Sequence, residues 1–288
     1  MTTIQITEYT DPACPFAWSA EPSRRRIQWL YGDQIELRPR MVGLSESGEA
    51  MAQKGMTTEM LAKGSAKLAA AHHMPMDTSE RPRLGASVPA CRAVVAVRLH
   101  EPDKEGAMLR ALRVRNFAGE LLDESTTLRH AAERAGVDPD ELERWLAEPE
   151  TEEALREDMR AARAPSPEAV ALPGKLAREP DSATGYRYTC PSWELTHDGR
   201  TATVPGFQPT TAYEVTIANL APELIRREDP SDVTEVLRWA GEPLASIEVA
   251  AVCGLELDDA REQLGRVATE EHIGSDGLWS LTPAAAAA

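Results

Sequence analysis

The first forty residues change from one apolar spacing to another and back. Ile4 and Ile6 are separated by polar residues, and this period of two predicts a strand over residues 2–9. From about Pro15 the apolar residues recur at helical spacing, which predicts a helix ahead of the next strand. A second alternating run at 34–44 predicts that strand, parallel to the first if the helix crosses over in the usual way.

The middle of the chain has a helical pattern. Alanine, leucine, arginine and glutamate dominate residues 49–163. Their apolar positions recur every three to four residues, as in helices that cover a core. Three prolines then break the pattern between 162 and 175. The predicted helices are 57–73, 88–100, 105–118, 125–135, 138–147 and 150–163.

Strand character returns at 186–204, where two β-rich runs flank Asp198-Gly199, a hairpin signal. A helix is predicted within 206–224, with Pro209 near its start. The predicted order is therefore β-α-β, a helical block, and then a β-hairpin followed by a helix.

The C-terminal segment is predicted to be a separate unit. Helices are expected at 232–240, 246–255 and 258–273, followed by a short hairpin-like piece at 274–282. Three short helices and a terminal β wing are typical of a winged helix. Residues 284–288 are five alanines, which we expect to be disordered or to fray.

Charge and composition narrow the possible partners. The net charge is −16, which disfavours nucleic acid and anionic membranes as partners. Residues 231–288 hold 11 Asp and Glu against 3 Arg and no Lys, a net of −8, whereas DNA contact needs the opposite sign. This tail is expected to pack against the main domain or to mediate dimerisation. The sequence shows no bilayer-spanning apolar stretch and no signal peptide, so a cytoplasmic protein with no membrane partner is expected.

Four cysteines are present, and none stands in a CxxC pair of the kind found in zinc sites. Cys14 directly precedes Pro15 at the predicted start of a helix. Unpaired N–H groups and the helix dipole favour a thiolate there, so Cys14 is a candidate nucleophile. Burial as a small apolar residue is the alternative. Cys91 and Cys253 fall on apolar helix faces and are expected in the core.

Two further clusters invite a functional interpretation. His72 and His73 are adjacent, but neighbouring residues of a helix do not share a face, so no metal site is expected. Arg24, Arg25 and Arg26 follow Cys14 closely and could attract an anionic substrate. A solvated helix face is the simpler interpretation of these arginines.

Four motifs in order carry a resemblance to a known family. They are Asp11-Pro12-Ala13-Cys14-Pro15-Phe16-Ala17-Trp18, VPACRAVVA at 88–96, Thr189-Cys190-Pro191, and GFQPTTAYE at 206–214. Over residues 2–228 the chain resembles the DsbA-like branch of the thioredoxin fold, and more closely its FrnE-like bacterial members.

The resemblance implies an α/β architecture, with a thioredoxin-like fold formed by 1–48 and 176–230 and a large inserted helical domain at 49–175. A small winged-helix-like domain at 231–283 would follow. By the same resemblance, Pro191 is the cis-proline of the fold, and Cys190 faces Cys14.

The chain departs from redox-active relatives at Ala17, where they carry a second cysteine. Cys14 is therefore expected to act as a single nucleophile that forms a mixed disulfide with a protein or small-molecule disulfide. Three routes could resolve it: a low-molecular-weight thiol such as glutathione, a protein partner, or Cys190. No bound cofactor is expected, only such a thiol as a co-substrate.

The expected substrate-binding residues surround this cysteine. The catalytic residues would be Cys14 and Cys190, with Thr189 and Pro191 positioning the substrate. Pro15, Phe16 and Trp18 would form an apolar rim, although Trp18 would serve equally well as a core residue.

Two rival functions remain open at this point. One is a glutathione-type transferase or isomerase of kappa-like architecture, in which the helix terminus activates the thiol of glutathione and Cys14 is incidental. The other is a non-catalytic binding or regulatory protein whose cleft has lost redox activity.

Overall fold

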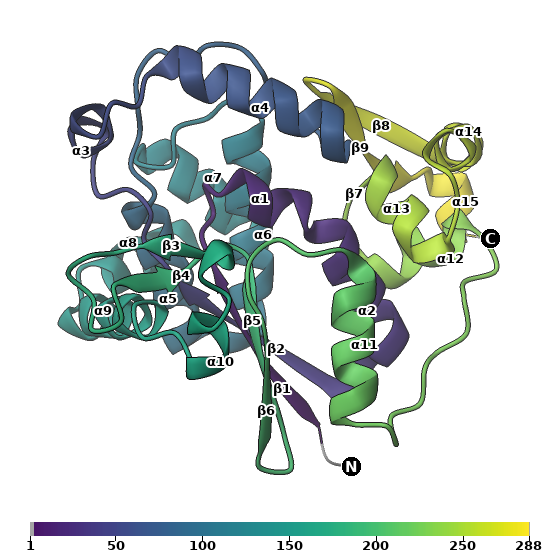
Figure 1. Ribbon diagram of the computed structural model, residues 1–288. Helices are drawn as coiled ribbons and strands as arrows, with labels where there is room; N and C mark the ends of the chain where they lie inside the picture. The colour runs from purple at the N-terminus through teal and green to yellow at the C-terminus, as the bar shows by residue number, and fades with distance from the viewer. Residues whose placement is uncertain (1–2, 288) are drawn as a thin grey trace.

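The computed structural model describes residues 3–287 and is built around a four-stranded sheet in the order β2-β1-β5-β6 (Figure 1). Strand β1 (Ile4–Thr10) pairs in parallel with β2 (Ile35–Met41) and antiparallel with β5 (Ser192–His197). Strand β6 (Arg200–Val204) completes the hairpin with β5. The predicted parallel pair and the predicted hairpin are confirmed.

Helices α2 (Glu21–Tyr31) and α11 (Thr210–Leu220) pack together beside the sheet. Their apolar side chains share one core with the strand residues Ile4, Ile6 and Trp193. The predicted first helix is in fact two, because α1 (Pro15–Ser19) ends at Ser19 and α2 begins at Glu21, with Ala20 between them. Pro22 lacks the N–H that would continue the helical hydrogen bonding, which favours this break.

The insertion follows β2 and is almost entirely helical. Helix α5 is largely buried, since every residue from Ala90 to Val97 except Arg92 is in the core. All six predicted helices are confirmed to within about one residue, whereas α3, α10 and strand β3 were not predicted. The elements are α3 (Gly48–Gln53), α4 (Thr58–His72), α5 (Val88–His100), α6 (Glu105–Phe117), α7 (Ser125–Ala135), α8 (Pro139–Leu146), α9 (Pro149–Ala162), α10 (Pro167–Val170), β3 (Leu176–Arg178) and β4 (Tyr186–Tyr188).

The C-terminal unit contains a small sheet in the order β7-β9-β8. Its elements are α12 (Val233–Ala240), β7 (Leu244–Ala245), α13 (Ser246–Cys253), α14 (Leu257–Val267), β8 (Ala268–Ile273), β9 (Asp276–Leu281) and α15 (Pro283–Ala287).

One prediction for this unit is wrong. The predicted helix 258–273 ends at Val267, because the following six residues pair with β9 instead. Of the five C-terminal alanines, those up to Ala287 belong to α15, and Ala288 lies outside the described residues. The hydroxyl of Thr282 accepts a hydrogen bond from the N–H of Ala285 and so caps the first turn of α15.

The C-terminal unit packs against the main body, as predicted. Helix α13 lies along α2, and Val236, Val249 and Leu264 join the same core as Ile27 (Figure 1). Gly274, between β8 and β9, also forms a bridge with Met76 of the insertion. No helix within residues 3–287 is long and apolar enough to cross a membrane.

Candidate functional site

Cys14 caps the N-terminus of α1, immediately after a turn that leaves β1. Its backbone is extended, its carbonyl accepts the N–H of Trp18 at 3.0 Å, and its own N–H donates to the carbonyl of Asp11 at 3.1 Å. The side chain makes no capping hydrogen bond to α1, but the nearby backbone N–H groups of Ala17 and Phe16 help to lower the pKa of the thiol. The predicted position at the positive end of a helix is therefore confirmed, although the side chain is only 5% exposed.

Cys190 lies against Cys14. The thiol of Cys14 donates a hydrogen bond to the carbonyl oxygen of Cys190 at 3.3 Å, and both side chains belong to one buried cluster. Both cysteines are free, and Cys190 is 6% exposed. The Cys190–Pro191 peptide bond is cis, as the resemblance predicted.

The surroundings shift the pKa values of the two thiols in opposite directions. The pKa of Cys14 is lowered, chiefly by the hydrogen bond from the Cys190 side chain, with the N–H groups of Ala17 and Phe16 adding to it against the effect of burial. Burial raises the pKa of Cys190 well above its ordinary value, and the hydrogen bond and charge of Cys14 raise it further. These opposite shifts favour ionisation of Cys14 before that of Cys190.

Asp11 fixes the loop that carries Cys14. Its carboxylate accepts hydrogen bonds from the N–H of Ala13 at 2.9 Å, the N–H of Leu44 at 2.8 Å and the hydroxyl of Ser87 at 2.8 Å. The thiol of Cys91 also donates to it at 3.4 Å. Cys91 is a core residue as predicted, and burial raises its pKa well above the ordinary value.

The role of Asp11 was missed from the sequence. Its negative charge opposes ionisation of both Cys14 and Cys190, so its contribution is to position the loop, not to activate the sulfur. The sequence did offer one signal. An aspartate directly after a strand can accept a hydrogen bond from the backbone N–H two residues later, which forms an Asx turn.

Phe16 is the exposed part of the predicted rim. Its side chain is 44% exposed, with the ring of Phe207 centred 6.0 Å away, and that ring lies 4.8 Å from the ring of His72. These three side chains form an aromatic rim on the outer side of α1. Sequence reasoning missed Phe207 and His72, which come from other parts of the chain.

The remaining predicted residues stay close to the cysteines. Pro15 is half-buried beside Cys14, and Pro191 is buried beside Cys190. Thr189 is partly exposed, and its hydroxyl donates to the carbonyl of Lys175 at 2.8 Å. The structure thus brings together every predicted site residue except Trp18.

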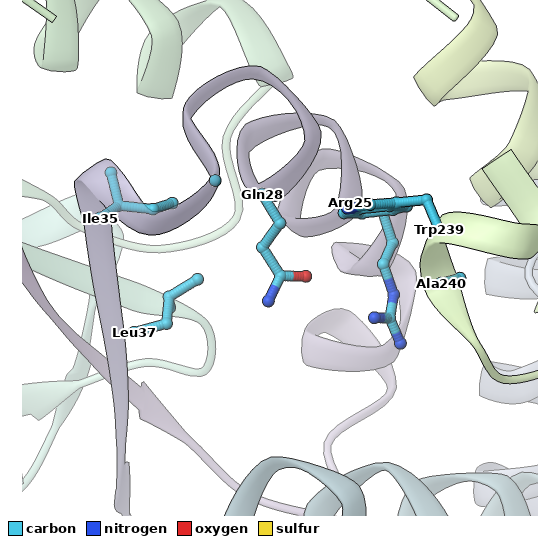
Figure 2. A pocket seen from close by; sticks show the side chains of 7 residues that line it. Arg25, Gln28, Ile35, Leu37, Trp239 and Ala240 are labelled. Carbon is cyan, nitrogen blue, oxygen red and sulfur yellow. The ribbon is translucent and has the colours of Figure 1, made fainter. Parts of the chain in front are cut away.

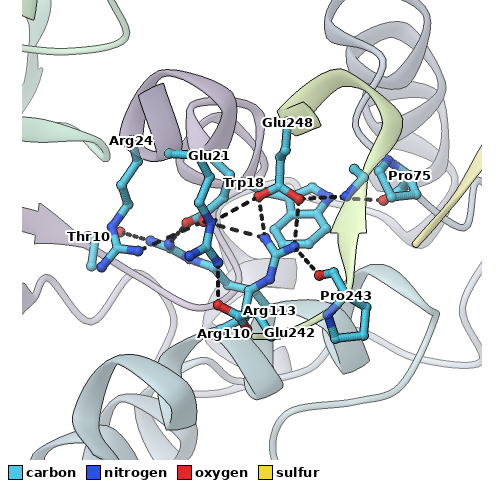
Figure 3. A network of polar contacts seen from close by, with 12 residues as sticks. Thr10, Trp18, Glu21, Arg24, Pro75, Arg110, Arg113, Glu242, Pro243 and Glu248 are labelled. Atoms are coloured by element: carbon cyan, nitrogen blue, oxygen red, sulfur yellow. Dashed lines mark hydrogen bonds and ion pairs between the residues drawn. The ribbon is translucent and has the colours of Figure 1, made fainter. Parts of the chain in front are cut away.

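Trp18 is fully buried and faces away from the rim. Its indole N–H donates to the carbonyl of Pro75 at 2.9 Å, and its ring stacks on Phe117 with the centroids 5.3 Å apart. The guanidinium of Arg110, on α6, lies 4.6 Å from the centroid of the Trp18 ring (Figure 3). The predicted role of Trp18 in substrate binding is therefore wrong, and the alternative of a core residue is correct.

The expectation of a solvated arginine face is also wrong, because the side chains of Arg24 and Arg25 enter a buried charge network (Figure 3), and Arg26 donates to the carbonyl of Val252. Arg25 pairs with Glu242 at 2.6 Å and with Glu248 at 3.5 Å, both on the C-terminal unit. The network also draws on α6 and β1, and its members are Glu8, Glu21, Arg24, Arg25, Arg110, Arg113, Glu242 and Glu248. Four arginines near Glu21 hold its pKa at about 2 in spite of burial.

The cavities lie away from the two cysteines. Figure 2 shows one of about 290 Å³ between α2, β2 and α12, lined by Arg25, Gln28, Gly32, Ile35, Leu37, Trp239 and Ala240. Another, of about 650 Å³, lies between α6 and the C-terminal unit. Cys14 and Cys190 line neither of them.

One group of potential metal ligands occurs within residues 3–287, formed by His197, Asp198 and Glu223. It lies at the far end of β5 from Cys190, and the imidazole Nε2 of His197 is already hydrogen-bonded to Glu223. This group has no connection with the cysteine pair.

Comparison with known proteins agrees with the geometry. A family model described as a DSBA-like thioredoxin domain matches residues 5–166. Among curated proteins, the ClpXP adapter protein SpxH of Halalkalibacterium halodurans is 26% identical over 277 residues, covering 94% of this chain and 84% of that protein.

Solved structures show the same fold. The cytosolic disulfide reductase DsbM of Pseudomonas aeruginosa superimposes with a TM-score of 0.52 at 16% identity, over 75% of this chain and all of that one, and it is also known with GSH. A structure titled "probable DsbA oxidoreductase" from Streptomyces coelicolor gives a TM-score of 0.54 at 22% identity, over 80% of this chain and 94% of that one.

Proposed function

Because the chain belongs to the DSBA-like thioredoxin family, we propose that it carries out thiol–disulfide exchange with Cys14 as the nucleophile. The observation that supports this most directly is the position of the Cys14 sulfur. It lies at the N-terminus of α1 and beside Cys190, and the Cys190 side chain and the N–H groups of Ala17 and Phe16 lower the pKa of Cys14, which favours a thiolate.

The first step follows from this charge state. The thiolate of Cys14 attacks one sulfur of a substrate disulfide, so a Cys14–substrate disulfide forms and the other substrate sulfur leaves as a thiolate. A second thiol, from a low-molecular-weight compound or a protein partner, then attacks the mixed disulfide and releases Cys14. The DsbM structure with GSH supports a small thiol of this kind as the co-substrate.

The surroundings of Cys14 indicate how a substrate would reach it. The aromatic rim of Phe16, Phe207 and His72 offers an apolar surface beside the cysteine. The partly exposed Thr189 lies next to Cys190. We propose that an extended or small disulfide contacts both the rim and Thr189, because the nearly buried sulfur leaves little room for a bulky group.

A second candidate function is that of a protein-binding adapter. The relative named as a ClpXP adapter protein aligns with 94% of this chain, including the C-terminal unit that the matched family model does not cover. The low exposure of Cys14 and the alanine at position 17 fit a fold used for binding as well. On this proposal, the chain would recognise a partner protein without turnover of disulfides.

Thiol reactivity tests the first proposal. The folded protein is incubated with oxidised glutathione, or with iodoacetamide over a pH series, and its intact mass is measured. We expect modification that depends on Cys14 and persists below pH ~8, where an ordinary thiol is protonated. The Cys14→Ser variant should lose it, whereas Cys253→Ser on the distant helix α13 should retain it. Equal behaviour of wild type and Cys14→Ser would reject the exchange reaction and leave the adapter role.

A further inference from the structure

Cys190 is a second thiol in contact with Cys14, and the exchange reaction proposed above does not use it. We infer that Cys190 is the resolving thiol of this site, which attacks Cys14 in the mixed disulfide and closes a Cys14–Cys190 disulfide. This inference rests on the proposed exchange reaction and adds to it the identity of the second sulfur. It replaces the CxxC pair, which Ala17 makes impossible, with a pair from two distant segments.

The contacts favour Cys190 over the other cysteines. The carbonyl of Cys190 accepts a hydrogen bond from the Cys14 thiol at 3.3 Å, and the two side chains share one buried cluster. Cys91 is fully buried and its thiol donates a hydrogen bond to Asp11. Cys253 lies on α13 in the C-terminal unit. Among the cysteines of residues 3–287, Cys190 is therefore the one placed to react with Cys14.

The resolving step balances without a further reagent. In the mixed disulfide, Cys190 gives up its proton and its sulfur attacks the sulfur of Cys14. The Cys14–Cys190 bond forms, the bond from Cys14 to the substrate breaks, and the substrate sulfur leaves with the electron pair and takes up a proton. The substrate disulfide has then been reduced to two thiols, and the cysteine pair has been oxidised. Two equivalents of a low-molecular-weight thiol would return the pair to its reduced form.

The local charges fit this order of events. Before the first step, the charge of Cys14 and its hydrogen bond help to raise the pKa of Cys190, so Cys190 stays protonated and supports the thiolate. Once Cys14 is bound in a disulfide, both of these contributions vanish, leaving burial and Asp11 opposed by Arg187. Cys190 therefore becomes easier to ionise only when its reaction partner is present.

The test compares wild type with Cys190→Ser and Cys190→Ala, incubated with oxidised glutathione and followed by intact mass and peptide mapping. Wild type should give a species that has lost two hydrogens, with the Cys14 and Cys190 peptides linked. The two variants should keep a glutathione adduct on Cys14 at least about tenfold longer, because an intramolecular thiol competes at a high effective concentration. Cys253→Ser serves as the matched control and should behave as wild type.

The possible outcomes separate the two proposals. A wild-type adduct as long-lived as that of both Cys190 variants would overturn the role of Cys190 while leaving Cys14 as the nucleophile. A wild type that reacts no differently from Cys14→Ser would overturn the exchange reaction itself. The comparison uses only variants whose near-ultraviolet circular dichroism matches that of wild type. Two different substitutions of Cys190 are made so that one remains if the other misfolds.

Discussion

Glu248 pairs with arginines of the main body and so holds the C-terminal unit against it. Replacing Glu248 with alanine should destabilise the protein strongly. The side chain is fully buried on α13. Its carboxylate accepts hydrogen bonds from the two terminal nitrogens of Arg110 at 2.9 and 2.6 Å, and from the N–H of Ala245 at 2.7 Å. Arg25 lies 3.5 Å away. Glu248 therefore joins α6 and α2 to the start of its own helix.

The magnitude follows from what Glu248→Ala leaves behind. Arg110 would keep only Glu21 at 3.4 Å and the carbonyl of Pro243 at 3.3 Å, both longer contacts, and would remain buried. Removing one partner of a buried ion pair costs about 3–5 kcal/mol. Because Arg110 retains these weaker partners, we expect a loss near the lower end, at about 3 kcal/mol.

Urea unfolding followed by tryptophan fluorescence measures this loss. The matched control is Glu262→Ala on α14, which removes a solvent-exposed pair with Arg266 and should cost ~0–1 kcal/mol. Limited proteolysis at the 221–232 connection should also speed up in Glu248→Ala, since that connection leads into the loosened unit. A loss no greater than that of the control, with unchanged proteolysis, would refute the reasoning that this network holds the unit in place.

Other predictions concern single sites. Burial raises the pKa of Glu105 to about 7, so its ionisation disfavours the folded state and stability falls as pH rises from ~4.5 to ~7. Thermal unfolding should show that Glu105→Gln stabilises the protein by up to ~3 kcal/mol at pH 8 and has no such effect near pH 4.5. Gly274→Ala should lower the melting temperature, because its Cβ would overlap the Met76 carbonyl and φ is +56°; unchanged melting would contradict this. Phe16→Ser should raise KM for a disulfide substrate more than it lowers kcat, if the rim with Phe207 binds substrate, and equal KM values would count against that role.

Local pattern was enough to place most elements and the reactive cysteine. The alternation around Ile4 and Ile6, the Asp198-Gly199 turn and the helix at 88–100 all follow from the intrinsic geometry of strands, turns and helices. Cys14 could be placed at a helix start because Pro15 marks the first helical position.

The same reasoning failed wherever a side chain had partners far along the chain. Trp18 and Arg25 have the residue types of a rim and of a solvated face, but α6 and the C-terminal unit cover both. Residues 268–273 follow a helical pattern yet pair with β9. The sequence signal for a buried charge network was the pair Arg110 and Arg113, which lie three residues apart among apolar positions of α6.

The sequence by itself determined the order of the elements, the helix terminus under Cys14 and the absence of a CxxC partner, because each depends on residues within a few positions. Only the tertiary structure decided the hydrogen bond from the Cys14 thiol to the carbonyl of Cys190, 176 residues away. The same holds for Asp11 and the arginine network, whose ion pairs and hydrogen bonds join segments that the sheet and the C-terminal unit bring together. Contacts of this kind depend on how the elements pack, which periodicity does not encode.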